Sequence, residues 1–234
     1  MFYTFAFFAT PLPAQCREMQ QIEGFQGSLE IVSGDGLTAA GETLEDVNIL
    51  QRSDEVLLRS ALRHDQVICQ LFSMTPVLPL RFGTCFRSVD KLLDYLGQHH
   101  QVYRQCLEQL GERAEYLLKA FVETSAESLV STPASGTDYL RTRRQQFLQQ
   151  QHTQQQVSQE QDNLKQLWPL PWPRLTLPPQ GDEQHREYFL LSPAEAEEAL
   201  HLSQNWQAQY PHWQLQWSTA LPPYHLLPLP MIPA

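Results

Sequence analysis

The sequence has little positive charge. Its 234 residues include 16 lysines and arginines against 26 aspartates and glutamates, which gives a formal net charge of -10. Nucleic-acid binding depends on basic side chains that release counterions from phosphates, so this balance argues against a nucleic-acid partner. With 42% hydrophobic and only 18% charged residues, the composition also excludes a wholly disordered chain. The length suits one large domain or two small ones.

The sequence also lacks a recognisable cysteine site. Cys16, Cys69, Cys85 and Cys106 are widely spaced, without a CxxC pair or the cysteine–histidine spacing of a zinc site. We interpret them as small hydrophobic residues of a reduced cytosolic protein, with Cys69 and Cys106 on the buried faces of helices.

Motifs of catalysis and cofactor binding are missing as well. There is no glycine-rich phosphate loop, no GxSxG, no HExxH and no DxDxDG. His99 and His100 are adjacent, but neighbouring residues on a helix point about 100° apart, so the pair is poorly placed to chelate a metal. The adjacent His64 and Asp65 have the same defect. We therefore predict a protein that is not an enzyme and that needs no cofactor or metal.

No uninterrupted apolar run approaches the roughly 18 residues that a membrane-spanning helix needs. Residues 1–14 are apolar, but they have no positively charged start and two prolines interrupt them early, so a β-strand explains them better than a signal peptide. Alternation should place Tyr3, Phe5 and Phe7 on one face of this strand. We expect a soluble intracellular protein without a membrane partner.

The first half combines strand and helix signals. After a glycine-rich region around a short strand at residues 28–32, an amphipathic helix follows Asp54, and a second helix runs from an N-cap at Ser88 to a C-cap at Gly111. Between these helices, residues 75–86 (TPVLPLRFGTCF) contain prolines that forbid a helix and restrict a strand to a sheet edge or to the non-bonded side of a ladder. The pattern predicts α+β layering.

One fixed cation, Arg81, lies among the apolar residues of this proline-bearing segment. A guanidinium in such surroundings is rarely left unpaired, so a carboxylate or a set of carbonyl groups should meet it. A structural ion pair is the favoured interpretation, and a functional or partner-binding arginine is the alternative. Gly83 indicates a β-bulge or a close approach of the backbone.

The second half contains the element order strand, helix, strand, strand, helix, strand. Its strands are predicted at residues 114–122, at 174–177 as the candidate for the second position, at 185–192 and at 212–220. A long helix covers about residues 138–167, and a shorter helix starts at a capping box formed by Ser192 and Glu195. This order is that of a ferredoxin-like sheet.

Two segments offer surfaces for a partner. The glutamine-rich stretch 145–161 is interpreted as a solvated helix, with a partner-binding face as the alternative. Residues 222–234 (PPYHLLPLPMIPA) are apolar and rich in proline, so we expect an extended chain that runs over a surface. This tail either packs back on its own domain or docks on another protein.

Four segments, taken in this order, resemble the gas vesicle protein family of the GvpF/GvpL type. They are VLPLRFGTCF (77–86), GERAEYLLKAF (111–121), SGTDYLRTRR (135–144) and WSTALPPYHL (217–226). The resemblance implies a modified ferredoxin-like N-terminal domain, 1–111, a ferredoxin-like C-terminal domain, 112–220, and an extended proline-rich tail, 221–234. It also implies a minor, non-enzymatic component of the gas vesicle, a hollow protein shell in the cytoplasm that gives buoyancy.

The resemblance carries family-like residues over to each segment. They are Pro79, Arg81, Phe82 and Gly83 in the first, Glu115 and Lys119 in the second, Tyr139, Leu140 and Arg143 in the third, and Pro222, Pro223 and Tyr224 in the last. The last segment departs from the family pattern, because Thr219-Ala220-Leu221 stands where the family has Gly-Pro-Trp. The compact length favours the GvpF-like branch over the GvpL-like one.

The implied partners are the small hydrophobic main shell protein and other minor gas vesicle proteins. An acidic protein with apolar surface, exposed sheet edges and an uncharged tail is suited to shield such a shell subunit, and it could nucleate the shell or stay on it. One alternative is a ferredoxin-like ligand-binding module or enzyme, with Arg81 paired to Glu115 across the domain junction as its site. Another is a general chaperone-like adaptor without a vesicle role.

Overall fold

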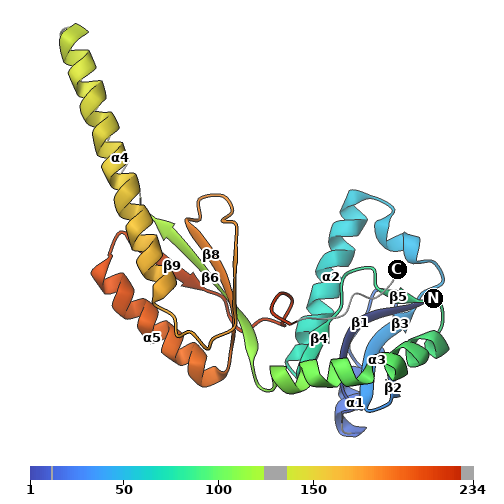
Figure 1. Ribbon diagram of the computed structural model, residues 1–234. Helices are drawn as coiled ribbons and strands as arrows, with labels where there is room; N and C mark the ends of the chain where they lie inside the picture. Colours follow the sequence, from blue (N-terminus) through green and yellow to red (C-terminus); the bar gives the residue numbers. More distant parts are fainter. Residues whose placement is uncertain (12, 124–135, 228–234) are drawn as a thin grey trace. The chain divides into compact units, whose positions relative to one another are not determined.

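The computed structural model describes residues 1–11, 13–123 and 136–227, except for the side chains of residues 13 and 136–140, and it divides the chain into two compact units (Figure 1). The first unit comprises Met1–Glu115 and the described residues from Ala220 onward, and the second comprises Tyr116–Thr219. Within this described part of the chain, none of the helices combines the length and the apolar character needed to cross a membrane.

The first unit is an antiparallel sheet covered by helices. Its elements in chain order are β1 (Phe2–Ala9), α1 (Pro13–Met19), β2 (Glu30–Gly34), β3 (Leu37–Thr43), the 3-10 helix η1 (Val47–Gln51), α2 (Asp54–Phe72), β4 (Val77–Pro79), β5 (Cys85–Phe86) and α3 (Val89–Leu110). The strand order is β2-β3-β1-β4, and β5 also pairs with β1. The first six regular helices and strands follow the ferredoxin-like order, and β5 and α3 modify it.

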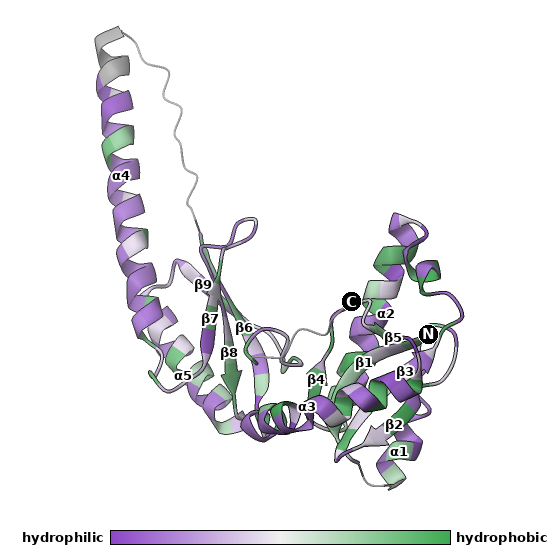
Figure 2. Ribbon diagram, turned by 45° about the vertical axis from the view of Figure 1, so that its right-hand side comes forward, coloured by the Kyte–Doolittle hydropathy of each residue, from purple (hydrophilic) through white to green (hydrophobic). Residues whose placement is uncertain are grey.

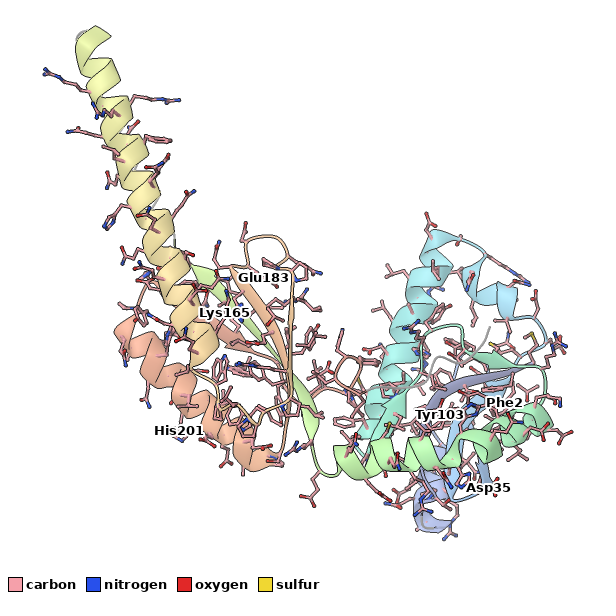
Figure 3. All side chains as sticks on the ribbon, viewed as in Figure 1. Phe2, Asp35, Tyr103, Lys165, Glu183 and His201 are labelled. Atoms are coloured by element: carbon pink, nitrogen blue, oxygen red, sulfur yellow. The ribbon has the colours of Figure 1, made fainter. Side chains whose placement is uncertain are left out.

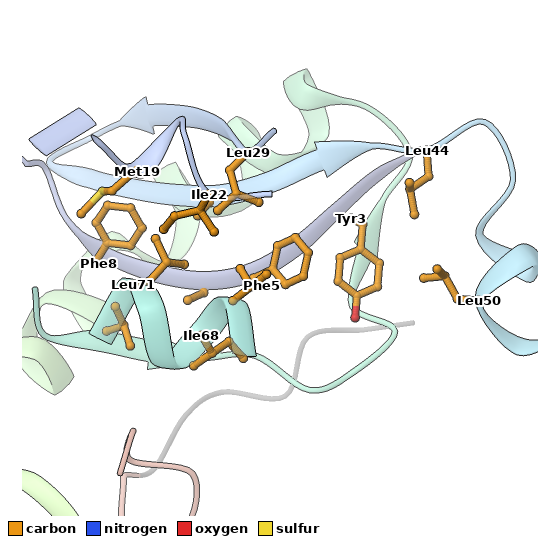
Figure 4. Packing of buried hydrophobic residues seen from close by; sticks show 14 residues of the cluster. Tyr3, Phe5, Phe8, Met19, Ile22, Leu29, Leu44, Leu50, Ile68 and Leu71 are labelled. Carbon is orange, nitrogen blue, oxygen red and sulfur yellow. The ribbon is translucent and has the colours of Figure 1, made fainter. Parts of the chain in front are cut away.

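Strand β1 is buried on both faces because helices cover both sides of the sheet. A β-bulge between Thr4 and Ala6 changes the alternation along it. Tyr3, Phe5, Ala6 and Phe8 therefore share the core with Val67, Ile68 and Leu71 of α2, which Figure 4 shows from close by.

The expected common face of Tyr3, Phe5 and Phe7 is therefore wrong. Phe7 packs on the opposite face, against two tyrosines of α3. The centroid of its ring lies 5.0 Å from that of Tyr103 and 6.5 Å from that of Tyr95. The reason is the bulge, which adds one residue to the strand and reverses the facing of those that follow.

Strand β3 had no clear signal in the sequence. It forms a hairpin with β2 through Asp35 and Gly36, which both have positive φ angles of 52° and 77°, as this tight turn requires. Gly41, in β3, lies opposite Thr4 at the bulge of β1, and a Cβ atom there would collide with the carbonyl oxygen of Tyr3 and the ring of Phe2. The glycine thus permits the close approach of β3 to the bulged strand.

The predicted ends of the second helix and the edge position of the proline-bearing strand are confirmed, whereas the first helix begins at Asp54 itself rather than after it. Strand β4 lies at one end of the strand path and pairs only with β1 among the described strands. Ser88 caps α3 by accepting a hydrogen bond from the backbone N–H of Lys91, and Gly111 ends this helix with a positive φ of 52°. Ser53 caps α2 by accepting from the N–H of Val56.

The second unit has the predicted order of elements. They are β6 (Ala114–Val122, whose first two residues belong to the first unit), α4 (Gly136–Gln166), β7 (Arg174–Leu177), β8 (His185–Leu191), α5 (Pro193–Gln209) and β9 (Trp213–Trp217). The sheet order β7-β8-β6-β9 is the ferredoxin-like one. The capping box of α5 is present, with Glu195 accepting from the N–H of Ser192 at 2.7 Å and Ser192 accepting from that of Glu195 at 3.3 Å.

One face of this sheet packs against α4 and α5. Leu164 of α4, Trp206 of α5 and Trp213 of β9 are buried together with Phe189 of β8. All five tryptophans of the chain lie in this unit, at positions 168, 172, 206, 213 and 217. Tryptophan fluorescence therefore reports on the second unit alone.

Gly41→Ala should destabilise the first unit by about 1–3 kcal/mol, because the added methyl group must displace the backbone of β1. Amide hydrogen exchange in β1 and β3 should therefore become faster. Tryptophan fluorescence, which reports on the second unit, should stay unchanged. Gly27→Ala is the matched control, since a Cβ atom at Gly27 meets nothing within 4 Å. Equal exchange in the two variants would contradict the role given to Gly41.

Candidate functional site

Two neighbouring side chains of α2, His64 and Asp65, connect this helix to three other parts of the first unit. These parts are β1, the turn after β4 and the segment around Tyr224. Because adjacent residues on a helix point about 100° apart, His64 faces the core and Asp65 faces outward. His64 contacts Tyr3 and the segment that follows β4, whereas Asp65 contacts Tyr224. The pair is unsuited to hold a metal ion, but it anchors two separate parts of the chain.

His64 lies in a chain of hydrogen bonds whose directions are fixed. Its Nε2 is 3.0 Å from the carbonyl oxygen of Leu80, which can only accept, so Nε2 carries the proton. In the neutral ring Nδ1 is then an acceptor, and the Tyr3 hydroxyl donates to it at 2.9 Å. The same hydroxyl accepts from the backbone N–H of Gly83 at 3.0 Å.

Burial is the main cause of the pKa shifts of His64 and Tyr3. It lowers the pKa of His64, although the bond to Leu80 acts in the opposite sense. Burial likewise raises the pKa of Tyr3, although the N–H of Gly83 acts to lower it. Both groups are therefore held in their neutral forms, which the hydrogen-bond directions require.

The turn after β4 depends on this arrangement. Pro79 is buried and pairs with Ala6, and the ring of Phe82 packs against those of Tyr3 and His64 at 6.3 and 5.6 Å. Gly83 has a φ of 90°, and a Cβ atom there would meet nothing within 4 Å. The expected bulge or close approach at Gly83 is thus a turn that needs a positive φ.

The expected partner of Arg81 is not found. Its side chain is exposed, and within the described part of the chain no carboxylate lies within ion-pairing distance of it. Arg81 has apolar neighbours in sequence, but they do not bury its guanidinium, because the turn directs it to solvent. Glu115 interacts with His225 instead, so the expected Arg81–Glu115 pair is wrong as well.

Glu115 anchors the start of the tail on the first unit. Its backbone forms an antiparallel bridge with Leu221, through hydrogen bonds of 3.0 and 2.8 Å. Its fully buried carboxylate accepts from the backbone N–H of His225 at 2.8 Å and lies 2.6 Å from His225 Nδ1. Pro222 and Pro223 between these contacts are buried. We call residues 221–225 the strap.

Tyr224 joins the strap to α2. Its hydroxyl donates to Asp65 at 2.6 Å. Burial of the hydroxyl end, together with this bond, raises the pKa of Tyr224, while 39% of the residue's surface remains exposed. The structure thus brings Glu115, Pro222, Pro223 and Tyr224 together.

The remaining family-like residues belong to the second unit. The Lys119 ammonium is 3.3 Å from the buried carboxylate of Glu183. Burial acts to raise the pKa of Glu183, but the N–H of Gln180, Lys119 and Arg186 together hold it below its usual value. Arg143 is exposed on α4, and Tyr139 and Leu140 lie in the same helix, with side chains outside the described residues.

A buried carboxylate that the sequence analysis missed fixes α4 to β9. Glu160 accepts from the indole Nε1 of Trp213 at 2.8 Å, lies 2.7 Å from Nε2 of His212, and accepts from Gln156 at 3.0 Å. Burial acts to raise its pKa, but these bonds hold it below its usual value. The available signal was the spacing, since Glu160 lies on the helix face of Val157 and Leu164.

An apolar surface lies beside the site, along the outer side of α2. Leu57, Leu58 and Leu62 are exposed there. A hollow of about 550 Å³ reaches Leu62. It is lined by Phe25, Ile49, Leu50, Val56 and Leu62, with Arg59 and Arg63 among its polar groups. We call this the α2 surface. Among the described residues there is no cluster of three or more potential metal ligands.

Acidification should destabilise the first unit through His64. The folded-state pKa of His64 is lowered, so the unfolded chain binds more protons once the pH falls below about 6.5, and stability decreases from there toward the folded-state pKa. Hydrogen exchange of β1 and α2 between pH 7.5 and pH 5 measures this loss, roughly spanning the titration of histidine. His64→Gln should flatten the profile, whereas His152→Gln, on the exposed part of α4, should leave it unchanged.

Glu115→Ala should release the strap. The backbone N–H of His225 then loses its buried acceptor, at a cost of about 1–3 kcal/mol, or roughly 5- to 150-fold faster amide exchange at Leu221 and His225. The exposed Glu112→Ala is the control and should leave exchange in the strap unchanged. Protection that survives Glu115→Ala would show that the bridge and the two prolines suffice.

Comparisons with known proteins agree on one family. The family model described as gas vesicle synthesis protein GvpL/GvpF matches residues 1–227. Gas vesicle protein L of Streptomyces sp. (strain CB03234) is 30% identical over 123 residues, which cover 49% of this chain and 46% of that protein, so the match spans about half the length of the relative.

Two solved structures share the fold. The crystal structure of GvpF from Anabaena sp. PCC7120 superposes with a TM-score of 0.66 at 18% identity, covering 95% of this chain and 94% of that one. That of GvpF from Microcystis aeruginosa gives 0.63 at 14% identity, covering 97% and 99%.

Proposed function

Because the chain belongs to the gas vesicle synthesis protein GvpL/GvpF family, we propose that it is a minor structural and assembly protein of the gas vesicle. It binds the hydrophobic main shell protein in the cytoplasm and supports formation of the vesicle that gives buoyancy. The observation that carries the proposal is the family match over residues 1–227, which takes in both units.

The α2 surface supports the binding part of the proposal. A hydrophobic subunit needs apolar surface on its carrier, and three exposed leucines beside a hollow of about 550 Å³ provide it. Arg59, Arg63 and Glu23 supply polar groups around it, as expected of an interface with an apolar centre and a polar rim. The strap is a weaker candidate, because Pro222 and Pro223 are buried against the first unit.

The alternative function, an enzyme or ligand-binding module with a site near Arg81, required a pair between Arg81 and Glu115. This pair is absent from the described residues. Arg81 is exposed, and the carboxylate expected beside it interacts with His225. An adaptor without a vesicle role remains distinguishable by genetics. Deletion of the gene should abolish vesicles seen by electron microscopy, and intact vesicles would refute the proposed role.

Leu58→Glu combined with Leu62→Glu should weaken capture of the main shell protein at least about tenfold, because it places two charges in the apolar contact. Leu170→Glu is the matched control, since Leu170 is 93% exposed in the second unit and should tolerate the same change. A pull-down of the shell protein by purified full-length chain, with titration of the shell protein, measures the effect.

A chain that ends after Leu227 separates the tail from the α2 surface and keeps the strap. We expect it to capture the shell protein as well as the full chain does. Loss of capture in this chain, with retention in the double glutamate variant, would move the binding site to residues 228–234. No capture by any form would refute shell binding.

A further inference from the structure

The first half of helix α4 stands free of the other described elements of its unit. Residues 141–156 are almost all exposed, while Val157, Leu164 and Leu167 farther along the helix pack against the sheet. In Figure 3 the side chains of this free half have no other described element beside them. We call residues 141–156 the arm.

The arm differs in charge from the rest of this acidic chain. Arg141, Arg143 and Arg144 lie at its beginning, and no aspartate or glutamate occurs from Tyr139 to Gln159. Among the described residues Arg144 has neither a hydrogen-bond nor an ion-pair partner. A cationic helix in a protein of net charge -10 is complementary to acidic surfaces, including those of another copy of the same chain.

The arm also exposes two large apolar side chains. Phe147 and Leu148 have 57% and 54% of their surfaces exposed, one turn after the arginines. Figure 2 shows a hydrophobic band within the mostly hydrophilic outer part of α4. A solvated helix with no partner is normally polar all round, so an apolar pair at this place indicates a contact.

Helix α5 presents a matching face on the outside of the same unit. Glu197, Leu200 and Gln204 are all exposed, and Leu200 has 45% of its surface exposed. They follow each other at steps of three and four residues, so they lie on one side of the helix. His201, beside Leu200, points away from the unit (Figure 3).

The two faces have the same length and opposite charge. Arg144, Leu148 and Gln151 are spaced by four and three residues, so both triplets span two helical turns in the order charge, leucine, glutamine. Parallel packing of the two helices would set Arg144 against Glu197, Leu148 against Leu200, and Gln151 against Gln204.

We propose that the arm of one copy binds the outer face of α5 of a second copy of this chain. The contact is heterologous, because each copy contributes a different face, so it can repeat from copy to copy into open chains or a ring. Two helical turns make a small interface, so the association is weak, transient and sensitive to salt. It uses the second unit, whereas the shell binding proposed above uses α2 in the first unit.

Charge reversal gives a sharp test with the full-length chain. Sedimentation velocity at up to about 0.5 mM protein should show association at about 0.02 M salt and its loss at about 0.5 M salt. Arg144→Glu or Glu197→Arg alone should weaken association about tenfold, because like charges then meet. A mixture of the two variants should restore it, since the arm of each complements α5 of the other.

Matched controls exclude a general effect of charge. Arg87→Glu and Glu45→Arg make the same changes at exposed positions of the first unit and should associate like the unaltered chain. Circular dichroism should give the same helix content for all variants. Nuclease treatment should have no effect.

Each contrary result overturns the proposal in its own way. A chain that stays monomeric at all concentrations refutes self-association. Sensitivity to Arg144→Glu together with indifference to Glu197→Arg, or failure of the mixture to associate, shows that the arm binds another acidic surface. Loss of association after nuclease treatment shows that the arm binds nucleic acid.

Discussion

The neutral imidazole of His64 links three segments of the first unit. It has to donate to the carbonyl of Leu80 and to accept from Tyr3, whose hydroxyl in turn orients the N–H of Gly83. The central strand, the first long helix and the turn after β4 therefore meet in one chain of hydrogen bonds. The next residue, Asp65, ties the strap to the outside of the same helix turn. Two adjacent residues thus connect segments that are far apart in the sequence.

Local chemistry made much of this fold predictable. The capping box at Ser192, the caps at Ser88 and Gly111 and the edge position of the proline-bearing strand each depend on a few neighbouring residues. The facing of Phe7 was not predictable, because it follows from a bulge that Gly41, on another strand, accommodates. The predicted ion pair of Arg81 was wrong for a related reason. The exposure of Arg81 is set by a turn whose shape depends on Tyr3 and His64.

Polar groups in this protein serve two different purposes. Glu115 and Glu160 are buried and accept several hydrogen bonds each, so they fix the strap to its unit and α4 to β9. The arginines of α4 and Glu197 and Glu198 of α5 lie in water, where attraction between charges is weak and depends on salt. Buried carboxylates therefore define the fold, whereas exposed charges are available for association.

The first unit is assembled from two pieces of chain that the whole second unit separates in sequence. On the ribosome, Glu115 emerges long before the strap that provides its partner. At about 5–20 residues per second, roughly 100 intervening residues take on the order of 5–20 s to synthesise. During this interval the carboxylate of Glu115 lacks His225. The unit reaches its final form only after the strap has been synthesised, which couples its maturation to the prior appearance of the second unit.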